Sequence, residues 1–93
     1  MRVAFIDDDP NELKILHTYF NDLTDPSTIS IDDFSSGEEF LSRFTAGLYD
    51  LVTLDIFTGD LTGVDVARKI RETDHNVRLV FCTTSNDFAS ESY

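Results

Sequence analysis

Three consecutive aspartates near the start of the sequence could do chemistry. Asp7, Asp8 and Asp9 directly follow the apolar residues VAFI, and Asp55 follows a second apolar run, LVTL. Neighbouring carboxylates repel one another, so such a group is either a solvated turn or a cation site. Mg²⁺ prefers oxygen ligands and usually binds one or two carboxylates while keeping several waters. A cation would also let Asp55 act as a nucleophile towards phosphate, because it would neutralise the carboxylate and the incoming phosphoryl oxygens.

Four short β-prone runs position these aspartates and alternate with helical patterns. The runs cover residues 3–6, 28–34, 51–54 and 77–82. Helical patterns follow at residues 10–23, 36–47 and 66–70, with a possible fourth helix over residues 86–93. This alternation predicts an α/β fold with a parallel sheet, helices on its faces and right-handed crossovers.

Local signals predict where the helices begin and end. Asp9 is suited to be the N-cap of a helix that starts at Pro10. Ser36 and Glu39 fit a capping box, and Gly47 is expected to terminate that second helix. Residues 57–63 contain two glycines and no regular period, which indicates a loop.

The expected strand ends gather polar side chains at one edge of the sheet. Asp7 to Asp9, then Asp55, then Thr83 and Thr84 each follow a strand. Ligands of open parallel sheets bind beyond the carboxyl ends of the strands, near the point where strand order reverses. If the first, third and fourth strands are neighbours, carboxylates and a hydroxyl converge there. From spacing alone, a metal site and ordinary turn acids both remain open.

Composition narrows the class of protein. The 93 residues are 41% apolar, which is enough for one domain with a real core. A formal charge of −11 opposes direct binding to nucleic acid or to an anionic membrane. The single cysteine, Cys82, precludes an intramolecular disulfide and is expected to be a small buried apolar residue. The N-terminus lacks the apolar stretch of a signal peptide, so we expect a cytoplasmic protein.

Four motifs in order resemble the receiver domain of two-component response regulators. FIDDDP resembles the family's first-strand acidic cluster, LVTLDI the strand with its phospho-acceptor aspartate, and VFCTTS the strand with its hydroxyl switch residue. Gly63 lies eight residues after Asp55, where the family has a glycine before its third helix. FSSGEEFL, GVDVARKIRE and TTSNDFASESY are most similar to the branch that precedes LytTR-type DNA-binding domains. The resemblance implies a flavodoxin-like, doubly wound sheet of order 2-1-3-4, with residues 1–93 forming a single receiver domain.

The resemblance also implies a role for each matching residue. Asp55 would accept a phosphoryl group from a sensor histidine kinase, in a switch rather than a turnover enzyme. Asp8 would bind Mg²⁺ directly, Asp7 would hold it through water, and the backbone carbonyl of Phe57 would be a further ligand. Thr83, rather than the next residue, aligns with the hydroxyl that moves to meet the phosphate.

Three departures from the family pattern qualify this expectation. Gly59 replaces a usual proline, and the bulky Phe57 borders the path of a hydrolytic water, which predicts slow self-dephosphorylation. The sequence also stops at Tyr93, before the family's fifth strand, its lysine and its fifth helix. Lys14 and Lys69 are on predicted helices away from the strand ends and cannot replace that lysine. We therefore expect either a fragment or a homodimer or domain-swapped oligomer that completes the sheet.

Two other functions stay open from the sequence. The first is a receiver-like interaction or dimerisation module that takes no phosphate, which the missing lysine favours. The second is a haloacid-dehalogenase-type phosphatase that would use Asp7 and Asp9. Against the second, Asn11 stands where that motif has Thr or Val, and the chain has no room for a cap or distal metal acids.

Two histidines and three basic residues of the third helix are expected to be ordinary solvent-facing side chains, although a partner-docking role for the basic residues of that helix stays open. His17 is predicted to face solvent from the first helix, and His75 to lie in the turn before the fourth strand. Arg68, Lys69 and Arg71 are predicted to form the solvated face of the third helix.

Overall fold

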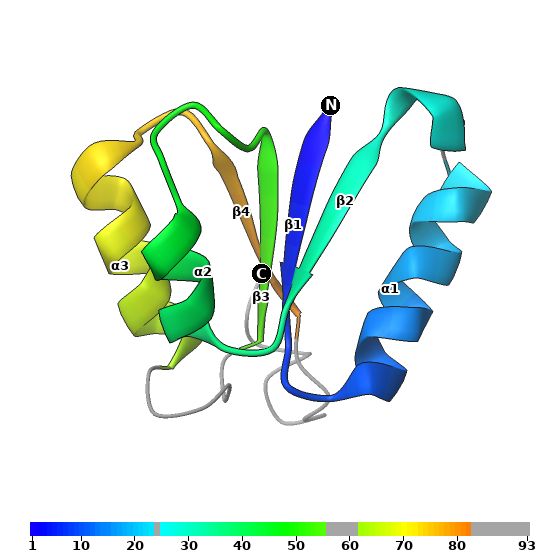
Figure 1. The fold of residues 1–93 in the computed structure, drawn as a ribbon, viewed down its shortest axis with the longest axis horizontal. Helices are drawn as coiled ribbons and strands as arrows, with labels where there is room; N and C mark the ends of the chain where they lie inside the picture. Colours follow the sequence, from blue (N-terminus) through cyan, green and yellow to red (C-terminus); the bar gives the residue numbers. More distant parts are fainter. Residues whose placement is uncertain (24, 56–61, 83–93) are drawn as a thin grey trace.

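Four five-residue strands form one parallel sheet in a computed structural model that describes residues 1–23, 25–55 and 62–82 (Figure 1). The strands are β1 (Arg2–Ile6), β2 (Ser30–Phe34), β3 (Leu51–Asp55) and β4 (Arg78–Cys82). Their order is β2-β1-β3-β4, and all three strand pairs are parallel. This confirms the predicted flavodoxin-like order. The helix α1 covers one face of the sheet, and α2 and α3 cover the other (Figure 1).

The helix α1 (Pro10–Leu23) begins where the sequence predicts. The carboxylate of Asp9 accepts a hydrogen bond from the Asn11 N–H at 2.9 Å, and its carbonyl accepts from the Leu13 N–H at 3.2 Å. Asp9 is therefore the N-cap, as expected. Beyond the helix, a 3₁₀ turn, η1 (Pro26–Thr28), delays β2. Because Thr28 is held in that turn by bonds to Asp25, the predicted start of the strand at Thr28 was wrong by two residues.

The helix α2 (Gly37–Arg43) is shorter than predicted. Ser36 caps it, with its hydroxyl accepting from the Glu39 N–H at 3.1 Å, but the Glu39 carboxylate accepts from the Ser35 hydroxyl instead of closing the capping box. Phe44 is already extended, so the helix ends before it. The prediction that Gly47 terminates the helix was wrong. Gly47 lies further along, in a turn with a positive φ of 82°.

The helix α3 (Gly63–Thr73) starts one residue after Thr62, whose hydroxyl accepts from the Asp65 N–H at 3.3 Å. Gly63 is thus the first helical residue and not the end of a loop. Arg71 also departs from its predicted solvated position. Its guanidinium donates to the carbonyl oxygen of Asp74 at 3.3 Å and to that of Val77 at 2.7 Å. Arg71 therefore fastens the end of α3 to the start of the next strand.

Strand alternation divides the core between the two faces and positions the acidic residues. The α2 and α3 side buries one apolar cluster, made of Ala4, Ile6, Phe34, Phe40, Tyr49, Val52, Leu54, Val66, Ile70 and Val77. Val3 and Phe5 are fully buried, and their side chains lie on the opposite face of β1, which faces α1. Because side chains alternate along a strand, Asp7 follows Val3 and Phe5 onto the α1 side.

Several predictions concern residues outside the described part of the chain. These are the Phe57 carbonyl, the Gly59 departure, the hydroxyls of Thr83 and Thr84 and the helix over 86–93. Among the described helices, none is long and apolar enough to cross a membrane.

Candidate metal site

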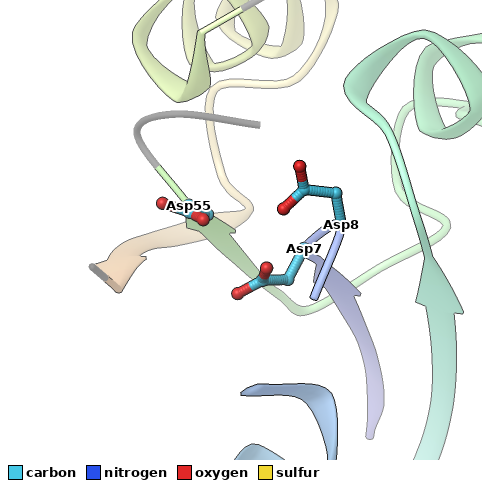
Figure 2. Close-up of side chains that lie close together, drawn as sticks. All are labelled: Asp7, Asp8 and Asp55. Atoms are coloured by element: carbon cyan, nitrogen blue, oxygen red, sulfur yellow. The ribbon is translucent and has the colours of Figure 1, made fainter. Parts of the chain in front are cut away.

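The carboxyl ends of β1 and β3 bring three carboxylates together. The parallel register pairs Ile6 with Leu54, so Asp7 follows the end of β1 beside Asp55 at the end of β3. Asp7, Asp8 and Asp55 each offer an oxygen, and these oxygens all lie within 4.8 Å of one another (Figure 2). The predicted convergence of acids from two strands is therefore present.

Asp7 is the most constrained of the three. It is only 4% exposed, and its N–H donates to the carbonyl of Phe34 at 3.0 Å, which ties the end of β1 to β2. One carboxylate oxygen accepts from the Asp9 N–H at 2.9 Å. Burial raises the pKa of Asp7 to about 6 against the lowering effect of that hydrogen bond, and repulsion from Asp55, Asp8 and Glu12 adds to the rise. An anionic Asp7 is thus unfavourable unless positive charge is near.

The other aspartates differ from Asp7 in exposure and direction. Asp8 is exposed and Asp55 is half-buried, so both are accessible at the rim. Asp9 is exposed, and its carboxylate caps α1 instead of joining the cluster. A phosphatase that needs both Asp7 and Asp9 in the site does not fit this arrangement.

Cys82 lies beside the carboxylates at the end of β4. The β3–β4 register pairs it with Asp55, and the residue is half-buried. Burial raises the pKa of the Cys82 thiol, and the carboxylates of Asp7, Asp55 and Glu12 raise it further. The thiol therefore stays protonated at neutral pH. Cys82 was expected to be buried and is only half-buried.

Two features of this region were missed from the sequence. The charge of Glu12, in the first turn of α1, adds to the raised pKa of Asp7 and of the Cys82 thiol. His17 does not simply face solvent, because its Nε2 lies 2.8 Å from a carboxylate oxygen of Asp33. His75 is exposed as predicted.

The donor set fits a hard divalent cation. All three clustered groups are carboxylates, and one of them is buried. Because water screens the repulsion between them poorly, a bound cation would offset it. One or two direct carboxylate ligands from this group, with the remaining positions held by water, match the preference of Mg²⁺. Lys14 and Lys69 are exposed side chains of α1 and α3.

A comparison with family models matches residues 3–92 to the response regulator receiver domain. Among curated relatives, the sensory transduction protein LytR of Staphylococcus haemolyticus is 31% identical over 93 residues, which is all of this chain and 36% of the relative. The chain thus spans about a third of the length of that relative. LytR proteins from other staphylococci also match, in agreement with the branch that the sequence resembles.

Two solved structures are similar over nearly the whole chain. One is the response regulator TrrA of Thermotoga maritima in complex with Mg²⁺-BeF, which is 31% identical, with a TM-score of 0.78, and aligns with 97% of this chain and 75% of TrrA. The other contains TrrA in complex with the histidine kinase ThkA, at 32% identity and a TM-score of 0.73, over 89% of this chain and 68% of that one.

Proposed function

Because the chain belongs to the family of response regulator receiver domains, we propose that Asp55 accepts a phosphoryl group from a sensor histidine kinase in a Mg²⁺-dependent reaction. The observation that carries this proposal is the convergence of Asp7, Asp8 and Asp55 within 4.8 Å at the carboxyl ends of β1 and β3. The complex of TrrA with Mg²⁺-BeF and its complex with ThkA support both the cation and the kinase.

Asp7, Asp8, Asp55 and the backbone carbonyl of Phe57 would hold Mg²⁺. When bound, the cation supplies positive charge that offsets the carboxylates and the phosphoryl oxygens. Asp7 is pinned by the Asp9 N–H and buried, so its carboxylate is preorganised. Asp8 is exposed at the rim, where solvent and a ligand can reach it.

Asp55 is the nucleophile in this proposal. One of its carboxylate oxygens forms a bond to phosphorus while the bond from phosphorus to the kinase imidazole nitrogen breaks, and the electron pair of that bond returns to the nitrogen. The product is an acyl phosphate on Asp55. The half-buried position of Asp55 at the end of β3 leaves it reachable by a second protein.

The phosphoryl group would then act as a switch, with the Thr83 hydroxyl donating to it and shifting an existing equilibrium near β4. We propose no direct contact of this segment with nucleic acid or membrane, because its net charge is −11. We also propose that the domain pairs with a second copy, as a homodimer or a swapped oligomer, and β4, an edge strand among the four described strands, is one place where such pairing could form. Residues 1–93 form one receiver domain in this proposal.

Acetyl phosphate and Mg²⁺ test the phosphoryl acceptor. We expect an intact-mass gain of one phosphoryl group in the parent protein and none in Asp55→Asn. Asp22→Asn, an exposed change of the same kind on α1, serves as the matched control and should be labelled like the parent.

The alternatives give different results in the same experiment. Label that survives in Asp55→Asn and maps to Asp7 would support a phosphatase-type nucleophile. An unlabelled parent protein, also after incubation with a phosphorylated kinase, would support a module that works by dimerisation alone.

A further inference from the structure

Asp9 links the candidate metal site to the start of α1 through two hydrogen bonds of the same kind. Its N–H donates to the Asp7 carboxylate at 2.9 Å, and its own carboxylate accepts from the Asn11 N–H at 2.9 Å. In each bond an aspartate accepts from the backbone two residues further on, which is an Asx turn. The two turns share Asp9, so the chain passes from the end of β1 into α1 through this residue (Figure 1).

The structure holds both ends of this linkage in place. Asp7 is buried, and its N–H donates to the carbonyl of Phe34 at 3.0 Å, so β2 holds its backbone. At the other end, the Asp9 carbonyl accepts from the Leu13 N–H at 3.2 Å, the first hydrogen bond of the helix. Because Asp9 precedes Pro10, it is restricted to the extended conformation that an N-cap residue needs.

The direction of the Asp7 carboxylate matters for the whole acidic cluster. Oxygens of Asp7, Asp8 and Asp55 lie within 4.8 Å of one another while the Asp7 carboxylate accepts from the Asp9 N–H (Figure 2). Metal ligands bind more tightly when groups behind them hold their orientation. Without the Asp9 side chain, the Asn11 N–H loses its acceptor and the first turn of α1 frays, so the N–H of residue 9 is held less firmly against Asp7.

We propose that Asp9 is a positioning residue of the metal site, whose side chain fixes the first turn of α1 and thereby keeps the Asp7 carboxylate directed for binding a divalent cation. This inference rests on the proposed function, because it requires that the site bind Mg²⁺. The Asp9 carboxylate caps α1 and is not among the clustered ligand oxygens, so its effect on the cation passes through the backbone.

The coupling between the cap and the cation is reciprocal. A cation that binds through Asp7 favours the arrangement in which this carboxylate also accepts from the Asp9 N–H, and so it stabilises the first turn of α1. We therefore expect Mg²⁺ to slow amide hydrogen exchange at Asn11, whose N–H bonds to Asp9. The Asn76 N–H bonds in the same way to Asp74 at the opposite end of the sheet, and its exchange should not change.

Two substitutions of Asp9 separate positioning from charge. Asp9→Ala and Asp9→Asn remove the same negative charge and so lose the same direct attraction for a cation. Asn is as good an N-cap as Asp, whereas a change to Ala shifts the equilibrium of the first turn by roughly fivefold. We expect Asp9→Ala to bind Mg²⁺ about two- to fivefold more weakly than Asp9→Asn does.

Asp74→Ala is the matched control for general loss of stability. It also removes a carboxylate that accepts backbone N–H groups in a turn, those of Asn76 and Val77, but at the opposite end of the sheet. We expect this variant to be less stable than the parent and to bind Mg²⁺ with the same dissociation constant.

The test is titration calorimetry of the intact protein with Mg²⁺, together with amide exchange measured by NMR in EDTA and in saturating Mg²⁺. Equal dissociation constants for Asp9→Ala and Asp9→Asn overturn the inference, whatever their Tm, since Asp9 then affects the cation by charge alone. Exchange at Asn11 that Mg²⁺ does not slow, or an equal loss of affinity in Asp74→Ala, also overturns it. A parent protein that binds no Mg²⁺ overturns the metal step of the proposed function as well, and the flat titration of the parent distinguishes that failure from the others.

Discussion

His17 on α1 is paired with Asp33 on β2, with the Nε2 atom 2.8 Å from one carboxylate oxygen and 3.0 Å from the other. The same imidazole packs edge-on against the ring of Phe5, with the two ring centroids 5.1 Å apart. A helix residue thus contacts both β1 and β2 through one side chain. This contact fixes α1 over the strands that end at the metal site.

The first prediction concerns the strength of this contact. We expect His17→Ala to lower the free energy of unfolding by about 1–2 kcal/mol, since it removes an aromatic contact and a partly exposed pair. Asp33→Asn should cost less, because it leaves the contact of His17 with Phe5 intact. Urea denaturation of both variants and of the double variant measures the coupling. Strictly additive effects would show that the pair contributes nothing.

The second prediction concerns Asp74, which joins two loops at the opposite end of the sheet. Its carboxylate accepts from the N–H groups of Gly47 at 2.9 Å, Asn76 at 2.9 Å and Val77 at 3.1 Å. We expect Asp74→Ala to lower Tm by roughly 5–15 °C, since three backbone donors lose their acceptor. Asp65→Ala, which removes a single helix-start contact, should lower it less.

The stabilisation of the fold by Asp74 depends on pH, and the direction of that dependence is defined. Hydrogen bonds from these N–H groups hold the pKa of Asp74 below its usual 3.8. Its stabilisation is therefore present above the unfolded pKa and lost as the pH falls through the lower folded value. The gap in Tm between the parent and Asp74→Ala should narrow only in strong acid. A gap that narrows already near pH 6 would contradict this assignment.

The sequence predicted the sheet and the acidic cluster because both depend on local periodicity. Alternation of strands and helices gives a parallel sheet, and in such a sheet the residues after each strand must meet at one edge. Asp7 and Asp55 therefore converge as expected. Asp9 was separated from them because a residue before Pro10 caps a helix.

Contacts between distant elements were not predictable in this way. Arg71 looked solvated from its helical spacing, but its partners are carbonyl oxygens beyond the end of α3. His17 pairs with a residue sixteen positions away on β2. Glu12 adds to the raised pKa of Cys82 at the end of β4, an effect between elements that are distant in the sequence.

The third prediction concerns the reactivity of Cys82. Because its thiol is half-buried and its pKa is raised by burial and by neighbouring carboxylates, we expect alkylation by iodoacetamide at pH 8 to be at least about tenfold slower in the native protein than in urea. Mass spectrometry over time measures both rates. Equal rates would mean that the end of β4 is open to solvent.

The last prediction concerns the charge of Asp7 when no cation is present. Its folded pKa of about 6 lies above the usual 3.8, so the folded protein binds this proton more tightly than the unfolded chain does. Protonated Asp7 therefore favours the folded state. This contribution to the free energy of unfolding is fully present below pH 3.8 and is lost as the pH rises through 6, with an upper limit of about 3 kcal/mol.

The variant Asp7→Asn tests this, because Asn carries no charge and keeps an oxygen that can accept a hydrogen bond from the Asp9 N–H. In EDTA, Asp7→Asn should therefore be more stable than the parent by roughly 1–3 kcal/mol at pH 7.5, and by nearly nothing at pH 4. Urea denaturation at both pH values tests this, with Asp22→Asn as the control. A variant that is less stable than the parent at pH 7.5 would show that ionised Asp7 stabilises the fold and does not oppose it.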